Sequence, residues 1–295
     1  MPLLEHGFFG AEADETRQKL LQKYSQLLTL LKELNDISHE YLRGLKFNPK
    51  DRHQWFAATW FIRGLMTFQS VLALLERGCI EDACALSRTL LQAYIRLAAI
   101  AADPKVLNRI LATALSEQRK RLGFYKTRKL KLPPNAAPVN LDALIAKTDA
   151  QIQKLGRATI TEYELITVGK TEEDYAAYLR MSDAAHTSPA DMESILKFDK
   201  KGNFLGYIYG PHDRDLATFA VYAGNLQSHN LVNTNKIIKG ALPASFTAFQ
   251  NRRIQLRSDM PGIFNPQMSV QTEEITLAAQ PKSSAKKERK RVIAE

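Results

Sequence analysis

The first 80 residues contain two segments in which apolar residues recur at helical spacing. In residues 14–45 they return every three or four positions: Leu20, Tyr24, Leu27, Leu31, Leu34, Ile37 and Tyr41. This period predicts one long amphipathic helix. Residues 49–76 are more densely apolar and end before Gly78, so they predict a second helix that is covered on several sides.

Further helices are predicted along most of the remaining chain. One spans residues 80–102 and ends where Asp103 precedes a proline, and the next starts at Pro104. Asn140 is a suitable N-cap for a helix to about residue 155. Thr171, followed by three acidic residues, predicts a helix to about residue 186, and a last long helix covers residues 213–238.

These elements predict an all-α fold, a bundle of six to eight helices in one domain over residues 12–240. A short extended segment is expected at residues 204–209 after a turn signal. Residues 241–295 predict an irregular, partly disordered C-terminal segment that ends in a flexible basic tail.

The formal net charge of +10 is concentrated in two segments. Residues 118–131 hold seven basic residues and no acidic one, and residues 282–295 carry a net +4, which leaves the rest at −1. Aromatic residues lie within the first segment, so it is the best candidate for contacting an RNA backbone. A solvated helix end that complements the helix dipole is the alternative. Its cations are Arg119, Lys120, Arg121, Lys126, Arg128, Lys129 and Lys131.

No segment predicts export or membrane insertion. The first ten residues lack the pattern of a signal peptide. The apolar stretch 83–101 contains three polar residues that would be costly in hydrocarbon, so it predicts a core helix. Cys79 and Cys84 fit neither a redox motif nor a zinc site and predict buried thiols in a reducing compartment. We therefore expect a cytoplasmic protein without membrane contact.

Three polar residues form a stripe on the predicted helix 80–102. Arg88, Gln92 and Arg96 are spaced four apart, so they share one face of an otherwise apolar surface. Buried arginines require partners. The stripe predicts either ion pairs with neighbouring helices or a polar pocket for an anionic ligand.

Arg180 and His186 are the candidates for catalysis. A histidine transfers protons near neutral pH, and an arginine stabilises the charge of a phosphorane-like transition state. The pair would cleave RNA without a metal, and neither a metal nor a cofactor is expected. On a continuous helix, six residues turn about 600°, so convergence of the two side chains needs a helix break or a second subunit. A structural role for both residues is the alternative.

Two segments carry a resemblance to known proteins: residues 83–92, ACALSRTLLQ, and residues 178–189, YLRMSDAAHTSP. They resemble an uncharacterised bacterial family of helical proteins of unknown function, over about residues 54–235. They are also distantly similar to the HEPN group, which includes metal-independent ribonucleases with an Arg-x(4–6)-His pair across a dimer interface. Met181 and Gln92 differ from the residues expected in these patterns.

The resemblance implies an endoribonuclease of toxin or antiviral type, with Arg180 and His186 catalytic, RNA as its partner and a homodimer as its assembly. The alternative is a non-catalytic helical binding or regulatory protein, in which Arg88, Gln92 and Arg96 line the pocket. Convergence of Arg180 and His186 in an accessible cleft, within one chain or across a two-fold axis, distinguishes the two.

Overall fold

The computed structural model describes residues 7–128, 140–156, 158–185, 196–199, 201–207 and 210–259. In these residues it contains ten α-helices, two 3-10 turns and one small hairpin. The helices are α1 (Ala11–Lys23), α2 (Ser25–Gly44), α3 (Arg52–Glu76), α4 (Ile80–Ala102), α5 (Val106–Arg128), α6 (Leu141–Lys154), α7 (Glu162–Gly169), α8 (Tyr175–Ala185), α10 (Leu216–Ile238) and α11 (Ala244–Asp259). The 3-10 turns are η1 (Gly7–Phe9) and η2 (Glu172–Asp174).

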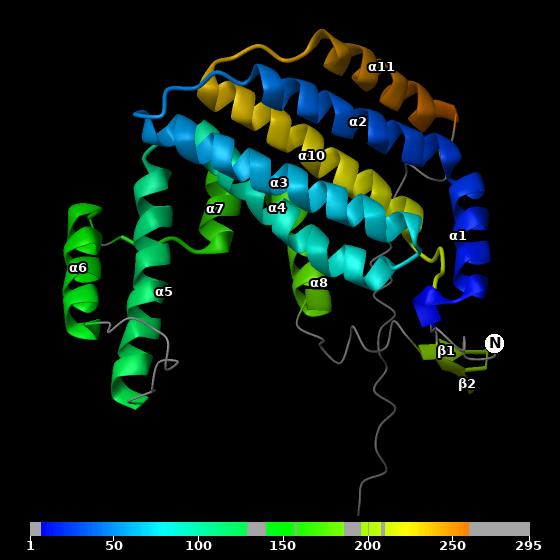
Figure 1. Ribbon diagram of the computed structural model, residues 1–295, viewed down its shortest axis with the longest axis horizontal. Helices are drawn as coiled ribbons and strands as arrows, with labels where there is room; N and C mark the ends of the chain where they lie inside the picture. Colours follow the sequence, from blue (N-terminus) through cyan, green and yellow to red (C-terminus); the bar gives the residue numbers. More distant parts are fainter. Residues whose placement is uncertain are drawn as a thin grey trace, which may run out of the picture.

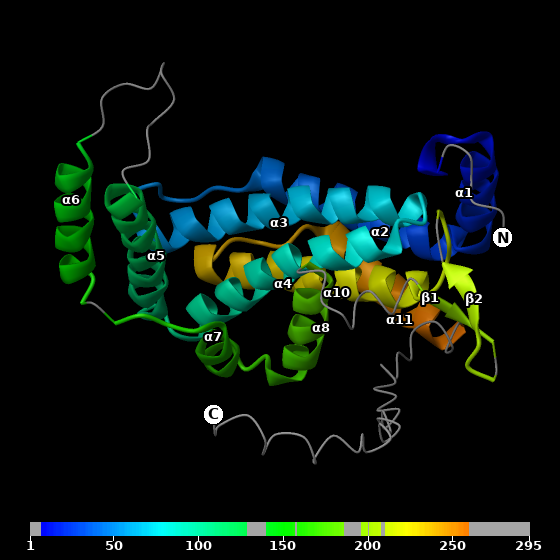
Figure 2. The ribbon, with the colours of Figure 1, turned by 90° about the horizontal axis from the view of Figure 1, so that it is seen from below.

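Four long helices, α2, α3, α4 and α10, run side by side and form the bundle (Figures 1 and 2). The apolar faces of all four helices meet in one core, which includes the fully buried Phe61, Phe68 and Leu90. α11 lies along the outer side of α2, and α7 and α8 pack against α4. The all-α prediction is therefore confirmed.

Local signals fix where α3 begins and ends. The Asp51 carboxylate accepts hydrogen bonds from the backbone N–H groups of His53 and Gln54, which caps the first turn. The helix ends at Glu76, and two residues later comes Gly78, whose φ of +71° is strained for other residues. The Gly78 carbonyl accepts a hydrogen bond from the His212 backbone N–H. This turn brings α4 back along α3.

The central part of α10 is polar although it is buried. Gln227, Asn230 and Thr234 have no exposed side-chain surface. The Gln227 amide donates to the Ser38 hydroxyl on α2 at 3.1 Å, and Asn230 lies directly against Gly64 of α3. A side chain at residue 64 would come within 2.9 Å of the Asn230 amide, so glycine permits this close helix contact.

α5 and α6 form an arm at one end of the bundle, opposite α1 (Figures 1 and 2). α6 packs against α5. Two contacts tie the base of the arm to the bundle: the His53 ring lies 3.0 Å from the Pro104 carbonyl, and Arg109 pairs with Glu164 of α7 at 2.6 Å. The arm therefore stands beside the start of α3.

The strands β1 (Leu196–Phe198) and β2 (Phe204–Tyr207) pair antiparallel. They agree with the predicted extended segment at residues 204–209 as far as residue 207. The hairpin exposes large apolar side chains at Phe198, Phe204, Leu205 and Tyr207.

The predicted count of six to eight helices is too low. The single helix expected over residues 14–45 is divided at Tyr24, where the chain turns so that the Tyr24 hydroxyl reaches the Asp213 carboxylate at 3.2 Å. α7 lies in a segment for which the sequence predicts no helix, and α11 lies in the segment after residue 240 that the sequence predicts to be irregular. Phe246 and Phe249 of α11 are buried, which supplies the packing that holds this helix. The expected basic tail lies outside the described residues.

In the described part of the chain, α3 alone is long and apolar enough to cross a membrane. Half of its most apolar stretch is buried inside the bundle, as expected for a core helix, so this is weak evidence for a span.

Candidate ligand-binding site

The arginine stripe of α4 lies under α7 and α8. Arg96 pairs with Glu162 of α7 at 2.5 Å and also donates to the Gln92 carbonyl at 2.9 Å. The Arg88 guanidinium lies 5.6 Å from the centre of the Tyr178 ring of α8. Arg88 and Arg96 thus each contact a neighbouring helix, and Gln92 takes part through its backbone carbonyl.

Glu164 connects α7 to the arm. Thr161 and Glu164 cap α7 reciprocally through their side chains and backbone N–H groups. The backbone N–H of Thr161, followed by the Arg109 guanidinium, lowers the pKa of Glu164 to about 2. A charged Glu164 therefore joins the start of α7 to α5.

Arg180 lies on the exposed side of α8, where it already has partners. Its guanidinium is 3.3 Å from the Asp215 carboxylate and 5.3 Å from the centre of the Phe219 ring, both at the start of α10. About half of the Arg180 side chain is exposed. His186 lies outside the described residues, so its distance from Arg180 is not defined and the catalytic pair remains a prediction.

Three of the predicted basic residues on α5 are paired with acids. Arg119 pairs with Asp149 of α6 at 3.2 Å, Lys126 pairs with Asp142 of α6, and Lys120 pairs with Glu117. The positive charge of this surface is therefore partly compensated, in contrast to a continuous basic strip. Lys129 and Lys131 lie outside the described residues.

Arg121 and Arg128 have no carboxylate within 4.0 Å in the described part of the chain. The Arg128 guanidinium lies 5.8 Å from the centre of the Phe124 ring. Arg121 instead lines a cavity between the arm and the bundle.

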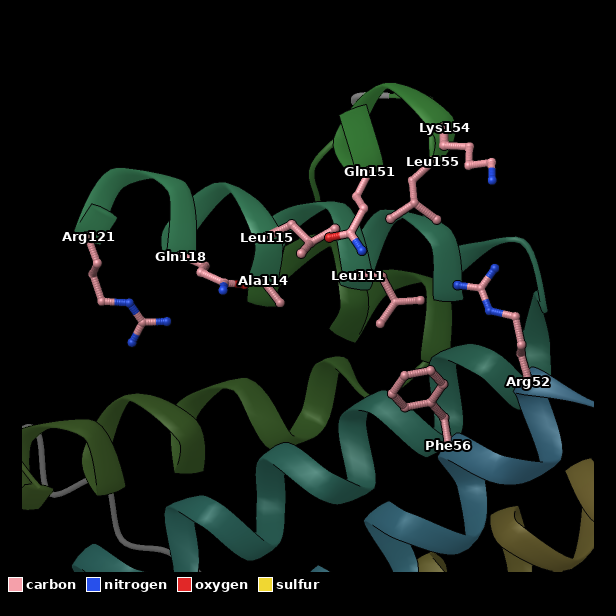
Figure 3. A pocket seen from close by; sticks show the side chains of 10 residues that line it. All are labelled: Arg52, Phe56, Leu111, Ala114, Leu115, Gln118, Arg121, Gln151, Lys154 and Leu155. Atoms are coloured by element: carbon pink, nitrogen blue, oxygen red, sulfur yellow. The ribbon is translucent and has the colours of Figure 1, made fainter. Parts of the chain in front are cut away.

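The cavity has a volume of about 830 Å³ and lies between the first turns of α3 and the facing sides of α5 and α6 (Figure 3). This volume is in the range of ligand pockets. Residues three or four apart on each helix face the same way, so each helix contributes one face. The lining residues are Arg52 and Phe56 from α3, Leu111, Ala114, Leu115, Gln118 and Arg121 from α5, and Gln151, Lys154 and Leu155 from the end of α6.

The cavity is basic at both ends, and between them it is lined by apolar side chains and by Gln118 and Gln151. Arg121 lies at one end, and Arg52 and Lys154 lie at the other (Figure 3). No carboxylate lines the cavity, and none of the three cations forms an ion pair with a described residue. Such a combination favours a ligand with negative charge at its ends and an apolar or aromatic part between them.

Phe56 is held in position by its neighbours. Its ring lies 4.7 Å from the Trp55 ring in an edge-to-face contact and 5.4 Å from the Trp60 ring. Because the ring is fixed before a ligand arrives, little conformational entropy is lost on stacking.

No group of three or more potential metal ligands is formed by the described residues. His212, Asp213 and Asp215 are potential metal ligands that lie close together in the sequence. Two of them contact other side chains instead: His212 is 3.0 Å from Glu81, and Asp213 pairs with Lys23. These contacts account for the side chains without an ion.

The fold and cavity define an all-helical protein with a basic-ended pocket between an arm and a bundle. Residues 54–204 match the model of a family of unknown function, DUF5677, and the chain belongs to this family. This confirms the expected membership in an uncharacterised family. No curated protein and no solved structure matches the chain.

The sequence pointed to one side of the cavity only. Arg121 was predicted from the basic stretch, whereas Arg52, Phe56 and Lys154 were not, because they belong to helices far apart in the sequence. The sequence did contain one indication of the cavity: the helical spacing of Leu111, Leu115 and Gln118 places them on the same face of α5 as Arg121. This spacing does not identify which helix lies opposite that face.

Proposed function

We propose that the protein binds single-stranded RNA, with one nucleotide in the cavity between α3, α5 and α6. The observation that carries this proposal is the set of three cations, Arg52, Arg121 and Lys154, which have no described carboxylate partner and surround an apolar floor. Guanidinium and ammonium groups bind phosphates, and the fixed Phe56 ring offers a stacking surface for a base.

Beyond the cavity, the proposed RNA strand continues along α5 past Arg121. Phe124 and Tyr125 are both about half exposed, and Arg128 lies against Phe124. Exposed aromatic rings beside cations are typical of surfaces that bind single strands without reading their sequence. Base pairing hides the faces of the bases, so duplex RNA binds more weakly.

The test is a fluorescence anisotropy titration of a labelled single-stranded RNA of eight nucleotides over a range of salt concentrations. Three phosphate contacts give a slope of log K against log salt of roughly −2. Arg121→Ala weakens binding and brings that slope closer to zero by about 0.7, because one phosphate contact is lost.

Lys19→Ala is the matched control. Lys19 is exposed and pairs with Glu15 on α1, at the opposite end of the molecule from the arm. This variant loses the same charge and retains the affinity of the parent protein. Equal losses in both variants would show that binding reflects net charge alone, and the proposal would be abandoned.

We propose RNA cleavage by Arg180 and His186 as the second function. The half-exposed Arg180 guanidinium favours it, because Asp215 and Phe219 hold this side chain in place on the exposed side of α8. The ribose 2′-oxygen attacks the adjacent phosphorus while the bond from phosphorus to the 5′-oxygen breaks. His186 takes the proton of the 2′-hydroxyl, the leaving 5′-oxygen takes a proton from water, and Arg180 stabilises the phosphorane-like charge.

The nuclease proposal is tested with labelled RNA in EDTA. Cleavage by the parent protein disappears in Arg180→Ala and in His186→Ala. Mixing the two inactive variants restores part of the activity if each site uses Arg180 of one protomer and His186 of its partner. Binding without cleavage in all samples would exclude the nuclease function and leave the RNA-binding function unaffected.

A further inference from the structure

The outward side of α3 carries almost no charge. From residue 55 to residue 73 its exposed positions recur at helical spacing, so they form one stripe along the helix. Arg63 is the charged member of this stripe. Trp55, Ile62 and Met66 are 44%, 39% and 55% exposed. The remaining members are small or uncharged: Thr59, Ser70 and Ala73.

The outward side of α2 has the composition expected of a helix side that faces water. Its exposed residues include Lys32, Asp36, Glu40 and Arg43. The stripe of α3 differs from it over about 27 Å, the length of 18 helical residues. No described element covers the stripe between the arm and α1 (Figures 1 and 2). An exposed apolar surface of this kind is typical of an interaction site.

The stripe protrudes at one end and is hollowed at the other. Trp55, its largest side chain, lies at the N-terminal end. Towards the C-terminal end there is a hollow of about 440 Å³ between α3 and α4. Met66, Ser70 and Ala73 of α3 and Leu86 of α4 contribute to its walls. The same surface thus presents a large side chain and a space for one.

A second copy of the chain in antiparallel orientation matches both features. A two-fold axis that crosses α3 near Arg63 exchanges the two ends of the stripe. Trp55 of each copy then meets the hollow of the other, and Ile62 comes opposite Met66 between these two contacts. Every contact occurs twice, as a two-fold interface requires.

The charges at the two ends of the stripe are complementary under this axis. Arg52 is exposed at the N-terminal end, and Asp82 of α4 is exposed one turn before Leu86, at the other end. Gly64 of α3 lies level with Ala93 of α4, against which it packs. Arg52 is therefore about 18 Å to one side of this level and Asp82 about 17 Å to the other. The two-fold axis brings Arg52 of one copy level with Asp82 of the other.

We propose that two copies of the chain form a dimer by packing their α3 helices against each other in antiparallel orientation. This inference depends neither on RNA binding nor on RNA cleavage. α8, which carries Arg180, lies on the opposite side of the bundle from the stripe (Figure 2). The dimer therefore leaves the two α8 helices apart.

Analytical ultracentrifugation of the full chain tests the dimer. The parent protein sediments as a dimer at micromolar concentrations. Met66→Glu raises the dissociation constant about a hundredfold, because it places a carboxylate in the middle of an apolar interface. Ile254→Glu is the matched control, since Ile254 is 65% exposed on α11, which lies beyond α2. This variant dimerises like the parent protein.

Charge reversal tests the antiparallel orientation. Arg52→Glu and Asp82→Arg each weaken the dimer about tenfold, since each places like charges side by side at both ends of the interface. The double variant restores the affinity of the parent protein, because the pair is present again with its signs exchanged. A double variant that associates as weakly as either single variant would overturn the proposed orientation.

Arg63 lies next to the axis, so its two copies carry like charges close together and oppose association. Arg63→Gln therefore tightens the dimer severalfold. Weaker association of this variant would contradict the position of the axis.

Three further outcomes would overturn the proposal. One is a parent protein that stays monomeric at every concentration. Another is equal weakening by Met66→Glu and Ile254→Glu, which would indicate association without a defined surface. The third is a monomer that binds vesicles of phosphatidylcholine and phosphatidylglycerol and loses this binding in Met66→Glu, which would assign the stripe to a membrane. Thermal unfolding of each variant shows that it folds like the parent protein.

Discussion

Among the described glycines, Gly78 is the one whose added Cβ atom would meet backbone atoms at less than 3 Å. Its φ is +71°, and a Cβ atom there would lie 2.9 Å from the backbone nitrogen and oxygen of His212 and 2.9 Å from a methyl of Leu20. These backbone atoms can move only if the whole segment that leads into α10 shifts. We predict that Gly78→Ala lowers the free energy of unfolding by roughly 3 kcal/mol, from left-handed strain and overpacking together.

Gly202 separates these two causes. It also has a positive φ, +82°, but no atom within 4 Å of an added Cβ. Gly202→Ala therefore carries the conformational cost alone, about 1 kcal/mol. Urea titrations of both variants measure the difference, and equal losses would mean that the contact with His212 contributes nothing.

The residues of the cavity differ in how far the sequence reveals them. Arg121 lies in a segment with an unusual excess of charge, which is visible without a structure. Lys154 is an ordinary exposed lysine until α6 folds back along α5, and Phe56 resembles the other aromatic residues of α3. Their role follows from tertiary contacts, which a single sequence does not contain.

At the level of elements, α7 depends on the ionised Glu164. Its pKa in the folded protein, about 2, lies below the ordinary value of 4.5, so its interactions stabilise the fold above pH 4.5. This contribution is lost as the pH falls from 4.5 towards 2, since protonation removes the acceptor for Arg109 and Thr161.

We predict that Glu164→Gln is less stable than the parent protein at neutral pH and loses less stability between pH 4.5 and 2. Chemical denaturation at several pH values checks this. Parallel pH profiles of the two proteins would contradict the assigned role of the carboxylate.

The long helices could be predicted from their apolar period, and α4 begins and ends where the proline and the period indicate. α7 was missed because eight residues are too few for a clear period. Its start was nevertheless encoded, since Thr161 and Glu164 have the spacing of a capping box. α11 was missed because its packing depends on two buried phenylalanines and on contact with α2, and neither is visible as a helical period in the sequence.

At the level of the whole molecule, the matched family region is smaller than the packed unit. Residues 54–204 include most of α3 and all of α4 to α8, whereas α2 and α10 lie outside the match. α10 packs along both α3 and α4, and α2 covers both α3 and α10. The Tyr41 ring of α2 lies 5.2 Å from the Phe61 ring, so removing α2 and α10 uncovers part of the core face of α3.

We therefore predict that a fragment of residues 54–204 does not unfold cooperatively, whereas a fragment of residues 7–259 does. Thermal unfolding followed by circular dichroism distinguishes them. A sharp transition for the shorter fragment, at a temperature near that of the longer one, would show that the matched region folds without α2 and α10.

The buried polar residues of α10 also determine its alignment along the neighbouring helices. A seam of leucines alone tolerates sliding, because every turn presents a similar surface. If α10 slid by one turn, about 5.4 Å, Asn230 would leave the gap beside Gly64 and Gln227 would lose Ser38. Competing alignments therefore lose the Gln227–Ser38 hydrogen bond and the fit of Asn230 beside Gly64, so one alignment of α10 has the lowest energy.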